Sequence, residues 1–539
     1  MATRSGVRRT PRVTAVVLAA TVAVLAPGVP VSPAGAQETG SAVTPPPVNP
    51  GMYPGNGGVR PDKAYVKKIE CVTRRELDEN VVLPNKPWGQ QYLRVEELHK
   101  LTRSATGSAG GGVKVAVIDT GVTPHPFFQG RVEPGGDYVA EVAPGAGLED
   151  CDGHGTEVAG IIAANPRDPN IGFVGVAPDA TIVSIRQSSQ NYGPPDENQA
   201  QPPAQDEPGQ PGGEQQPENP PEGGSGDQPN ALRGSGGAGT GPAQNGPTRQ
   251  LNKEDAAGNL TTLAYAVARA TEIEGVRVIN ISINNCRDAA LPMNEGEARL
   301  QAAVHHAVER DIVVVAAAGN TSESCKQNDQ LDPSKPRSIV TPPWFANDVL
   351  SVAAIDETGS VADFSVNGPW VSVAAPGTNI ISLDPAKNSN LLANRMVEGN
   401  GEPMPIQGTS FAAPYVSGVV ALVRAKYPHL SARQVMHRIT STAQHPGGRE
   451  GRDNFTGYGV INPMAALTAT IPSEEGVPPA RPERMPSDMP PWHEGSDVPL
   501  IVAFAGAGGA LVALFVTLFV VHTIRRNRRE PTTPRRGTV

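Results

Sequence analysis

The sequence lacks two features that would indicate a nucleic-acid-binding or a metal-dependent protein. Its formal net charge is −9 at pH 7, and its arginines gather at the two ends of the chain instead of forming a basic surface. Apart from His154, the histidines stand in no motif with a second type of metal ligand. We therefore expect no nucleic-acid partner, no metal and no cofactor.

Large apolar side chains are missing from one long internal stretch. Between Ile185 and Leu232 there is no valine, leucine, isoleucine, phenylalanine or tryptophan, and the whole chain holds 59 glycines and 55 prolines. Such a segment buries too little surface to offset the entropy lost on ordering. We expect residues 187–248 to be a disordered surface insertion, which is either simply tolerated or serves as a processing site or partner tether. Residues 37–62, rich in proline and glycine, are expected to be unstructured as well.

The N-terminus carries the signals of an exported protein. Residues 1–36 contain a cluster of arginines, then an uncharged apolar run from Val13, then the small residues Ala34, Gly35 and Ala36. This order is typical of a signal peptide that is cleaved before Gln37. An uncleaved membrane anchor is the alternative.

A second apolar segment near the C-terminus predicts a membrane anchor. Residues 498–521 carry no charge and are long enough to cross a hydrocarbon core of ~30 Å as a helix. Arginines follow at once, so the positive-inside rule places the basic tail, residues 522–539, in the cytoplasm. Residues 471–497 are proline-rich and should form a semi-rigid linker. We expect a single-pass protein of the cell membrane whose main domain is extracytoplasmic.

The central part, residues 86–470, alternates short apolar strands with helices. This alternation is typical of an α/β fold with a mainly parallel sheet and helices on both faces, in three layers. The expected strands are residues 113–118, 181–185, 277–283, 312–316, 349–355 and 370–374, and the expected helices are residues 155–164, 260–270, 296–309, 410–425 and 432–440. In such sheets, functional sites lie at the carboxyl ends of the strands.

Four motifs place reactive side chains at strand ends or helix starts. Asp119 ends the strand of VKVAVIDTG, and His154 starts a helix in DGHGTEVAG. Asn320 follows the strand of IVVVAAAGN, and Ser410 starts the helix of GTSFAAPYVSG. His154 would take the proton of Ser410, and Asp119 would orient His154. The Asn320 amide and the Ser410 backbone N–H, at the positive end of a helix dipole, would form an oxyanion hole.

The order Asp, His, Asn, Ser along the chain resembles that of subtilisin-type proteases and excludes the chymotrypsin and α/β-hydrolase orders. The four motifs are similar to subtilase signatures. Together with the leader, the membrane segment and four cysteines, they make the chain resemble the mycosins, membrane-anchored subtilisin-like proteases of type VII secretion systems. The resemblance implies a serine endopeptidase that cleaves few protein or peptide substrates and is associated with the secretion membrane complex. A structural subunit of that complex, with proteolysis secondary, is the alternative.

One strand departs from the subtilase pattern. Where subtilases carry Ser-Leu-Gly-Gly at the cleft wall, this chain has Ser-Ile-Asn-Asn at residues 282–285. The substrate-contacting residues that the resemblance implies are Ser282, Ile283, Asn284 and Gly319. Because two side chains replace two glycines, we expect a narrower cleft and fewer substrates.

The four cysteines of an exported chain are expected to form two disulfides. Cys286 and Cys325 each follow one of two neighbouring strands at the same edge of the sheet, which favours their pairing. Cys71 is then left to pair with Cys151. This second bridge would hold the N-terminal extension, residues 37–85, permanently beside the catalytic histidine, whereas a removable propeptide is the alternative.

Overall fold

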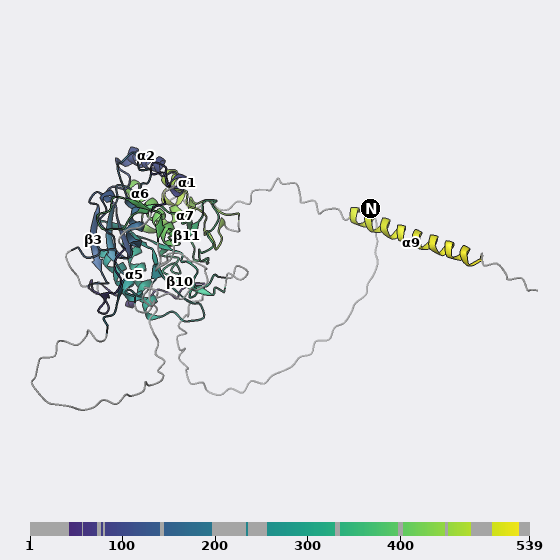
Figure 1. The fold of residues 1–539 in the computed structure, drawn as a ribbon, viewed down its shortest axis with the longest axis horizontal. Helices are drawn as coiled ribbons and strands as arrows, with labels where there is room; N and C mark the ends of the chain where they lie inside the picture. The colour runs from purple at the N-terminus through teal and green to yellow at the C-terminus, as the bar shows by residue number, and fades with distance from the viewer. Residues whose placement is uncertain are drawn as a thin grey trace, which may run out of the picture. The chain divides into compact units, whose positions relative to one another are not determined.

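The computed structural model describes residues 43–55, 58–72, 77–78, 81–140, 145–196, 256–328, 335–396, 403–447, 451–475 and 498–527, together with the backbone of residues 233–234. These residues belong to two units, one ending at Glu474 and one starting at Glu475 (Figure 1). Each unit is described by itself. The expected signal peptide, the linker and the basic tail lie almost entirely outside the described residues.

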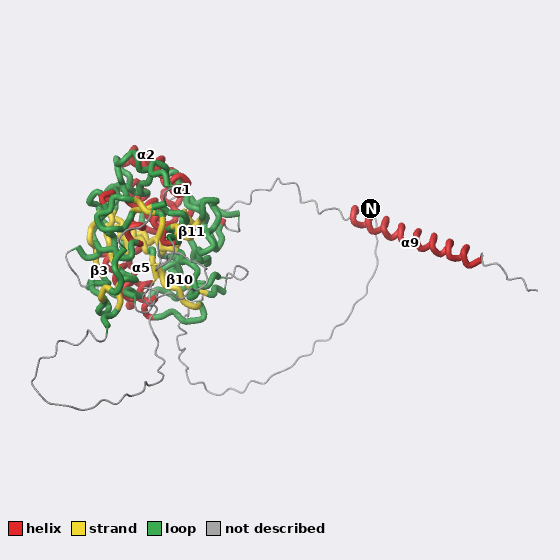
Figure 2. Tube along the Cα trace, in the orientation of Figure 1, coloured by secondary structure: helices red, strands yellow, loops and turns green. Residues whose placement is uncertain are grey.

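A seven-stranded parallel sheet runs through the first unit (Figure 2). Its order is β12-β11-β9-β7-β2-β4-β3, and every neighbouring pair is parallel. The strands are β2 (Lys114–Asp119), β3 (Val132–Asp137), β4 (Thr181–Arg186), β7 (Val276–Ile281), β9 (Val313–Ala317), β11 (Val349–Ile355) and β12 (Val373–Pro376). Their central residues are mostly valine, isoleucine and alanine and are buried, as in a sheet that is covered on both faces.

Helices pack around this sheet, α3 against α6 and α4 against α5. The helices of the first unit are η1 (Pro50–Met52), α1 (Trp88–Tyr92), α2 (Val95–Thr106), η2 (Pro126–Phe128), α3 (His154–Ala163), α4 (Leu260–Glu272), α5 (Glu295–Glu309), α6 (Thr409–Lys426), α7 (Ala432–Ser441) and α8 (Pro463–Thr468). The short helix η5 (Pro472–Glu475) lies at the boundary between the units. Asn259, Asn294 and Ser431 start α4, α5 and α7 with reciprocal capping boxes, which satisfy the first backbone N–H groups of each helix. Helix α6 passes through the core because small residues line it: a Cβ on Gly418 would lie 2.5 Å from the Cβ of Val176.

Short strands form small sheets beside the main one. The pairs are β1 (Val66–Lys67) with β5 (Tyr192–Gly193), β13 (Ser382–Leu383) with β14 (Leu392–Ala393), and β15 (Arg395–Met396) with β16 (Met404–Pro405). A further sheet has the order β10-β8-β6, formed by β10 (Ser338–Thr341), β8 (Ile283–Asp288) and β6 (Arg233–Gly234). All of these pairs are antiparallel.

The structure confirms the predicted α/β class, with three differences in detail. The strand expected at residues 277–283 is two strands, since the chain leaves the main sheet after β7 and β8 pairs elsewhere. The strand expected at residues 370–374 is displaced to β12. Strand β3 was not predicted, because Pro134, Gly135 and Gly136 are typical of a turn. As β3 lies at the edge of the sheet, its proline does not break an inner hydrogen-bond ladder.

Two segments that we expected to be unstructured are packed where the structure describes them. In the N-terminal segment, the ring of Tyr53 lies 4.3 Å from that of His306, and Gln301 Nε2 donates to Pro46 O at 2.8 Å. At the start of the predicted insertion, residues 187–192 are mostly buried, and β5 pairs with β1. The prediction was therefore wrong for residues 43–55 and 187–192, while residues 37–42, 56–57, 197–232 and 235–248 lie outside the described part.

The second unit contains α9 (Val498–Asn527), whose stretch Pro499–Asn527 is long and apolar enough to cross a membrane. It extends beyond the predicted span at its C-terminal end, into the arginines that follow. Arg525 and Arg526 stand in its last turn, where positive side chains complement the helix dipole.

Candidate active site

The structure brings Asp119 and His154 into contact. Asp119 is the last residue of β2, and His154 is the first residue of α3. Both side chains are buried, and a hydrogen bond of 2.7 Å joins His154 Nδ1 to Asp119 Oδ1. The helix start comes this close to the strand end because residue 155 is a glycine: a Cβ on Gly155 would lie 2.0 Å from the carbonyl oxygen of Gly121.

The surroundings of His154 favour its protonated form. Burial lowers the pKa of His154, but the negative charge and hydrogen bond of Asp119 outweigh burial and raise the pKa to about 9. Glu157 and Asp150 act in the same direction as Asp119. In the neutral ring, Nδ1 donates to Asp119, so Nε2 is the acceptor. Nε2 is buried and has no hydrogen bond within the described part of the chain, which suits a proton acceptor.

Ser410 stands in the first turn of α6, whose start lies near His154. The ring of Phe411, the next residue, has its centroid 5.1 Å from that of His154. Helix α6 begins after Gly408, whose φ of 149° and extended ψ suit glycine. Since the N–H groups of a first helical turn have no acceptor within the helix, the backbone N–H of Ser410 is oriented to stabilise an anion.

A serine from the neighbouring loop supports the turn that holds Ser410. Pro414 stands inside α6 and has no N–H, so the usual helical donor to the carbonyl of Ser410 is missing. The hydroxyl of Ser282 supplies it, donating to Ser410 O at 2.8 Å. The Ser282 hydroxyl also accepts a hydrogen bond of 2.9 Å from Asn280 Nδ2. Thus the side chain of Ser282, which we expected to contact substrate, contacts the backbone of Ser410.

The amide of Asn320 has a fixed orientation. Its Oδ1 accepts hydrogen bonds from the backbone N–H of Thr409 at 3.0 Å and from the Thr409 hydroxyl at 2.9 Å. A backbone N–H can only donate, so the atom facing it must be Oδ1, and Nδ2 lies on the other side of the amide. Gly319, at φ 101°, donates its N–H to the same hydroxyl at 3.1 Å. The donor Nδ2 of Asn320 is thereby held at the start of α6, as an oxyanion hole requires.

The strand expected to pair with substrate is paired with the insertion. Asn284 lies opposite Arg233 and Ile283 lies opposite Gly234, antiparallel, while the other edge of β8 pairs with β10. Asn284 and Ile283 are buried. The two side chains that replace glycines, at residues 284 and 285, therefore belong to a strand with neighbours on both edges.

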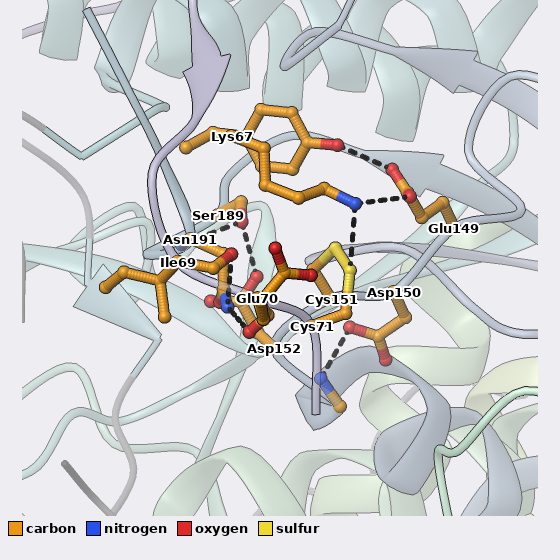
Figure 3. Close-up of a disulfide and its surroundings, with 12 residues drawn as sticks. Lys67, Ile69, Glu70, Cys71, Glu149, Asp150, Cys151, Asp152, Ser189 and Asn191 are labelled. Atoms are coloured by element: carbon orange, nitrogen blue, oxygen red, sulfur yellow. Dashed lines mark hydrogen bonds and ion pairs between the residues drawn. A yellow bond between two sulfur atoms is a disulfide. The ribbon is translucent and has the colours of Figure 1, made fainter. Parts of the chain in front are cut away.

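The two predicted disulfides are present. Cys286 and Cys325 have a Cα separation of 5.6 Å, and Cys71 and Cys151 one of 4.1 Å. Figure 3 shows the second bridge, with Lys67 and Glu149 on one side of it and Asp150 on the other. The structure thus confirms both pairings.

Backbone contacts continue from the Cys71–Cys151 bridge and tie the extension to the catalytic unit. The N–H of Val72 donates to Cys151 O at 2.9 Å, and Asn191 Nδ2 donates to Glu70 O at 2.8 Å. The sulfur atoms of this bridge lie near the Glu149 carboxylate, but two sulfurs bonded to each other offer no thiolate for a metal.

Sequence reasoning missed two carboxylates that precede His154, one buried and one partly buried. Asp152 accepts hydrogen bonds from the Ser189 hydroxyl at 2.6 Å and from Gln190 N at 2.7 Å, and burial raises the pKa of Asp152 to about 6. Asp150 is more deeply buried than Asp152 and contacts four donors. The available signal was the pair of aspartates around Cys151, since charged residues rarely sit in a buried loop unless they are hydrogen-bonded.

The family comparisons agree with this geometry. The model of the subtilase family matches residues 110–459, which include all four motif residues. Mycosin-1 of Mycobacterium tuberculosis is 40% identical over 89% of this chain and 92% of its own length. The chain belongs to the mycosin family of subtilases. It is therefore a subtilisin-like serine endopeptidase.

Solved mycosin structures share the fold. The crystal structure of MycP1 from Mycobacterium smegmatis is 35% identical, with a TM-score of 0.62 over 82% of this chain and all of that one. A chain in the structure of an intact ESX-5 inner membrane complex is 34% identical, with a TM-score of 0.63 over 89% of this chain and all of that one. This mycosin thus resembles relatives solved both alone and within a membrane assembly.

Proposed function

We propose that this mycosin is a membrane-anchored endopeptidase that cleaves a limited set of exported substrates by acyl transfer at Ser410. The observation that carries the proposal is the buried hydrogen bond between His154 Nδ1 and Asp119 Oδ1 next to the start of α6. A histidine held in this tautomer, beside a serine at a helix start, is the arrangement that activates a serine hydroxyl.

In the proposed mechanism, His154 Nε2 takes the hydroxyl proton as Ser410 Oγ attacks the peptide carbonyl. Asp119 stabilises the resulting imidazolium, which then gives its proton to the leaving amine. The Asn320 amide and the Ser410 backbone N–H donate to the oxyanion of the tetrahedral intermediate. Water repeats the sequence and releases the acid.

The place of action follows from the ends of the chain and from the relatives. We place the catalytic unit outside the cytoplasm, with α9 in the bilayer and the arginines after it inside. The relatives include a chain of an ESX-5 inner membrane complex and MycP1, an essential component of the type VII (ESX-1) secretion system. We therefore infer that this mycosin is part of such a complex and acts on its secreted substrates.

Labelling with a fluorophosphonate probe tests the nucleophile. The purified ectodomain, from residue 37 to residue 489, should be labelled on Ser410, and Ser410→Ala should abolish the label. Ser441→Ala, a change of a serine at the end of α7, serves as the control and should still be labelled. Labelling that persists in Ser410→Ala would refute the assignment.

A second function, structural support of the secretion complex, is favoured by the likeness to a chain of the ESX-5 assembly. The same substitution separates the two functions in cells. If proteolysis is the main role, Ser410→Ala should act like a deletion of the whole gene. If support is the main role, secretion should continue with Ser410→Ala and stop only when the protein is absent.

A further inference from the structure

Asp150, which lies in the loop before α3, accepts hydrogen bonds from both sides of the catalytic pair. Its Oδ1 accepts from the Thr120 hydroxyl and from Gly153 N, both at 2.8 Å. Its Oδ2 accepts from Thr156 N at 2.8 Å and from the Thr156 hydroxyl at 2.7 Å. Thr120 directly follows Asp119, while Gly153 and Thr156 flank His154 along the chain (Figure 3 labels Asp150 beside the disulfide).

The two threonine hydroxyls extend these contacts to the backbone. The Thr120 hydroxyl accepts from Gly155 N at 3.0 Å, and the Thr156 hydroxyl accepts from Thr123 N at 2.9 Å. The Thr156 hydroxyl donates to Asp150, and the Thr120 hydroxyl, which also lies 3.3 Å from Asp119 Oδ1, has its shorter contact with Asp150. The loop after β2 and the first turn of α3 are thus joined twice through one carboxylate, in addition to the direct contact between Asp119 and His154.

The contacts of Asp150 also stabilise its charged form. Two donors face each carboxylate oxygen, and one of each pair is a backbone N–H, which can only donate. Burial raises the pKa of Asp150 above its ordinary value, and its four hydrogen bonds oppose this shift without reversing it. The four donors stabilise the anion against this burial, and a neutral amide of the same shape would turn its NH₂ group toward two donors.

We propose that Asp150 is a positioning residue for proton transfer: it fixes the start of α3 against the end of β2, so that His154 is aligned with both Asp119 and Ser410. This inference rests on the catalytic roles proposed above. Asp150 touches neither Ser410 nor Asp119 in any described hydrogen bond, so it acts through Thr120, Gly153 and Thr156. The second effect of Asp150 is electrostatic: together with Asp119 and Glu157, its negative charge raises the pKa of His154.

The test uses the fluorophosphonate probe on the full-length protein in detergent, because the probe needs no known substrate. For Asp150→Asn, the maximal labelling rate should fall by about 10- to 100-fold, as expected for a misaligned base, while the probe concentration for half-maximal rate stays the same. The midpoint of the rate–pH profile should also move to lower pH, because His154 loses a neighbouring negative charge. Asp453→Asn is the matched control: Asp453 accepts hydrogen bonds from Phe455 N and Thr456 within its own turn, and its variant should label normally.

A second pair of variants covers the case in which Asp150→Asn does not fold. Thr120→Val removes the hydroxyl that links Gly155 to Asp150, whereas Thr120→Ser keeps it. The valine variant should label about 10-fold more slowly, with an unchanged pH midpoint because the charge of Asp150 remains, and the serine variant should label at nearly the normal rate. Equal rates for the two variants, or a normal rate and midpoint for Asp150→Asn, would refute the role of Asp150. Absence of the label from Ser410 in the unmodified protein would instead refute the proposed function.

Discussion

At the scale of single residues, the protonation of His154 sets the pH range in which the protein can act. The base must be neutral, and the pKa of His154 is raised to about 9 by Asp119, against an ordinary value of about 6.5. The rate of Ser410 labelling should therefore still rise between pH 7 and pH 9 and level off above this range. A rate that is already constant from pH 7 upward would contradict the strong influence of Asp119.

Asn320 offers a second test, because its two amide atoms have separate roles. Asn320→Ala removes the donor Nδ2 and should lower the maximal labelling rate by about 100- to 1000-fold, the usual loss for one oxyanion donor. Asn320→Asp keeps an oxygen that can accept from Thr409 but replaces the donor with a negative charge, so it should be at least as slow. If Asn320→Asp retained the normal rate, Asn320 would serve only to support Thr409.

Site residues could be predicted from the sequence where they stand in a local motif, but not where their role depends on a contact with a distant segment. Asp119, His154, Asn320 and Ser410 each stand at a strand end or helix start within a short motif, so local chain geometry indicates their positions. The role of Asp150 depends on Thr120, 30 residues earlier, and no local pattern shows this contact. The hydroxyl of Ser282 likewise acquires its partner only because Pro414 removes a helical donor on a distant segment.

At the scale of elements, the pairing of β6 with β8 has a testable consequence. Gly234 lies opposite Ile283, next to Ser282, which contacts the backbone of Ser410. A peptide that added to this edge of β8 would have to replace β6, since one strand edge pairs with one partner. Replacing Arg233 and Gly234 with two prolines, which cannot sustain a ladder, should raise the cleavage rate of peptide substrates severalfold.

The matched control for this change places two prolines at Gly212 and Gly213, in the same insertion. That variant should cleave peptides at the normal rate, because it leaves the partner of β8 intact. The measurement is the initial cleavage rate over a peptide library, compared among the three proteins. Equal rates for both proline variants would show that β6 does not compete with substrate.

The elements themselves were predictable where apolar periodicity and length agree. Strand β11 and the bodies of α4, α5 and α7 coincide with the expected ranges because buried valine and alanine runs and capping residues mark them. Strand β3 was not predicted because its glycines suggest a turn. The packing of residues 43–55 was not predicted because it depends on contacts with α5 and not on a pattern within the segment itself.

At the scale of the whole molecule, the apolar helix α9 should decide where the protein is found. Its residues are exposed in the structure, and large apolar side chains such as Phe504, Phe515 and Phe519 are at least 68% exposed, which an aqueous protein tolerates poorly. A truncation after residue 489 should therefore move the protein from the membrane fraction to the soluble fraction, with Ser410 labelling retained. If the truncated protein stayed in the membrane fraction, another part of the chain would have to bind the bilayer or a membrane partner.

The two disulfides should stabilise the fold by similar amounts but constrain different parts of it. They close loops with sequence separations of 80 and 39 residues, and the entropy of loop closure gives about 4 kcal/mol for each. The double variants Cys71→Ser/Cys151→Ser and Cys286→Ser/Cys325→Ser should both unfold at lower urea concentrations than the unmodified protein.

Limited proteolysis should distinguish these two variants, because no other disulfide holds the extension near Cys71. Around Lys67 and Lys68 the other links are the short β1–β5 pairing, a few hydrogen bonds, and the ion pairs of the two lysines with Glu149 and Asp196, each contributing about 1 kcal/mol. Without the Cys71–Cys151 bridge, trypsin should cut rapidly after Lys67 or Lys68 under conditions in which the Cys286–Cys325 variant remains intact there. Equal protection of both lysines in the two variants would mean that strand pairing alone holds the extension, and that the bridge adds only global stability.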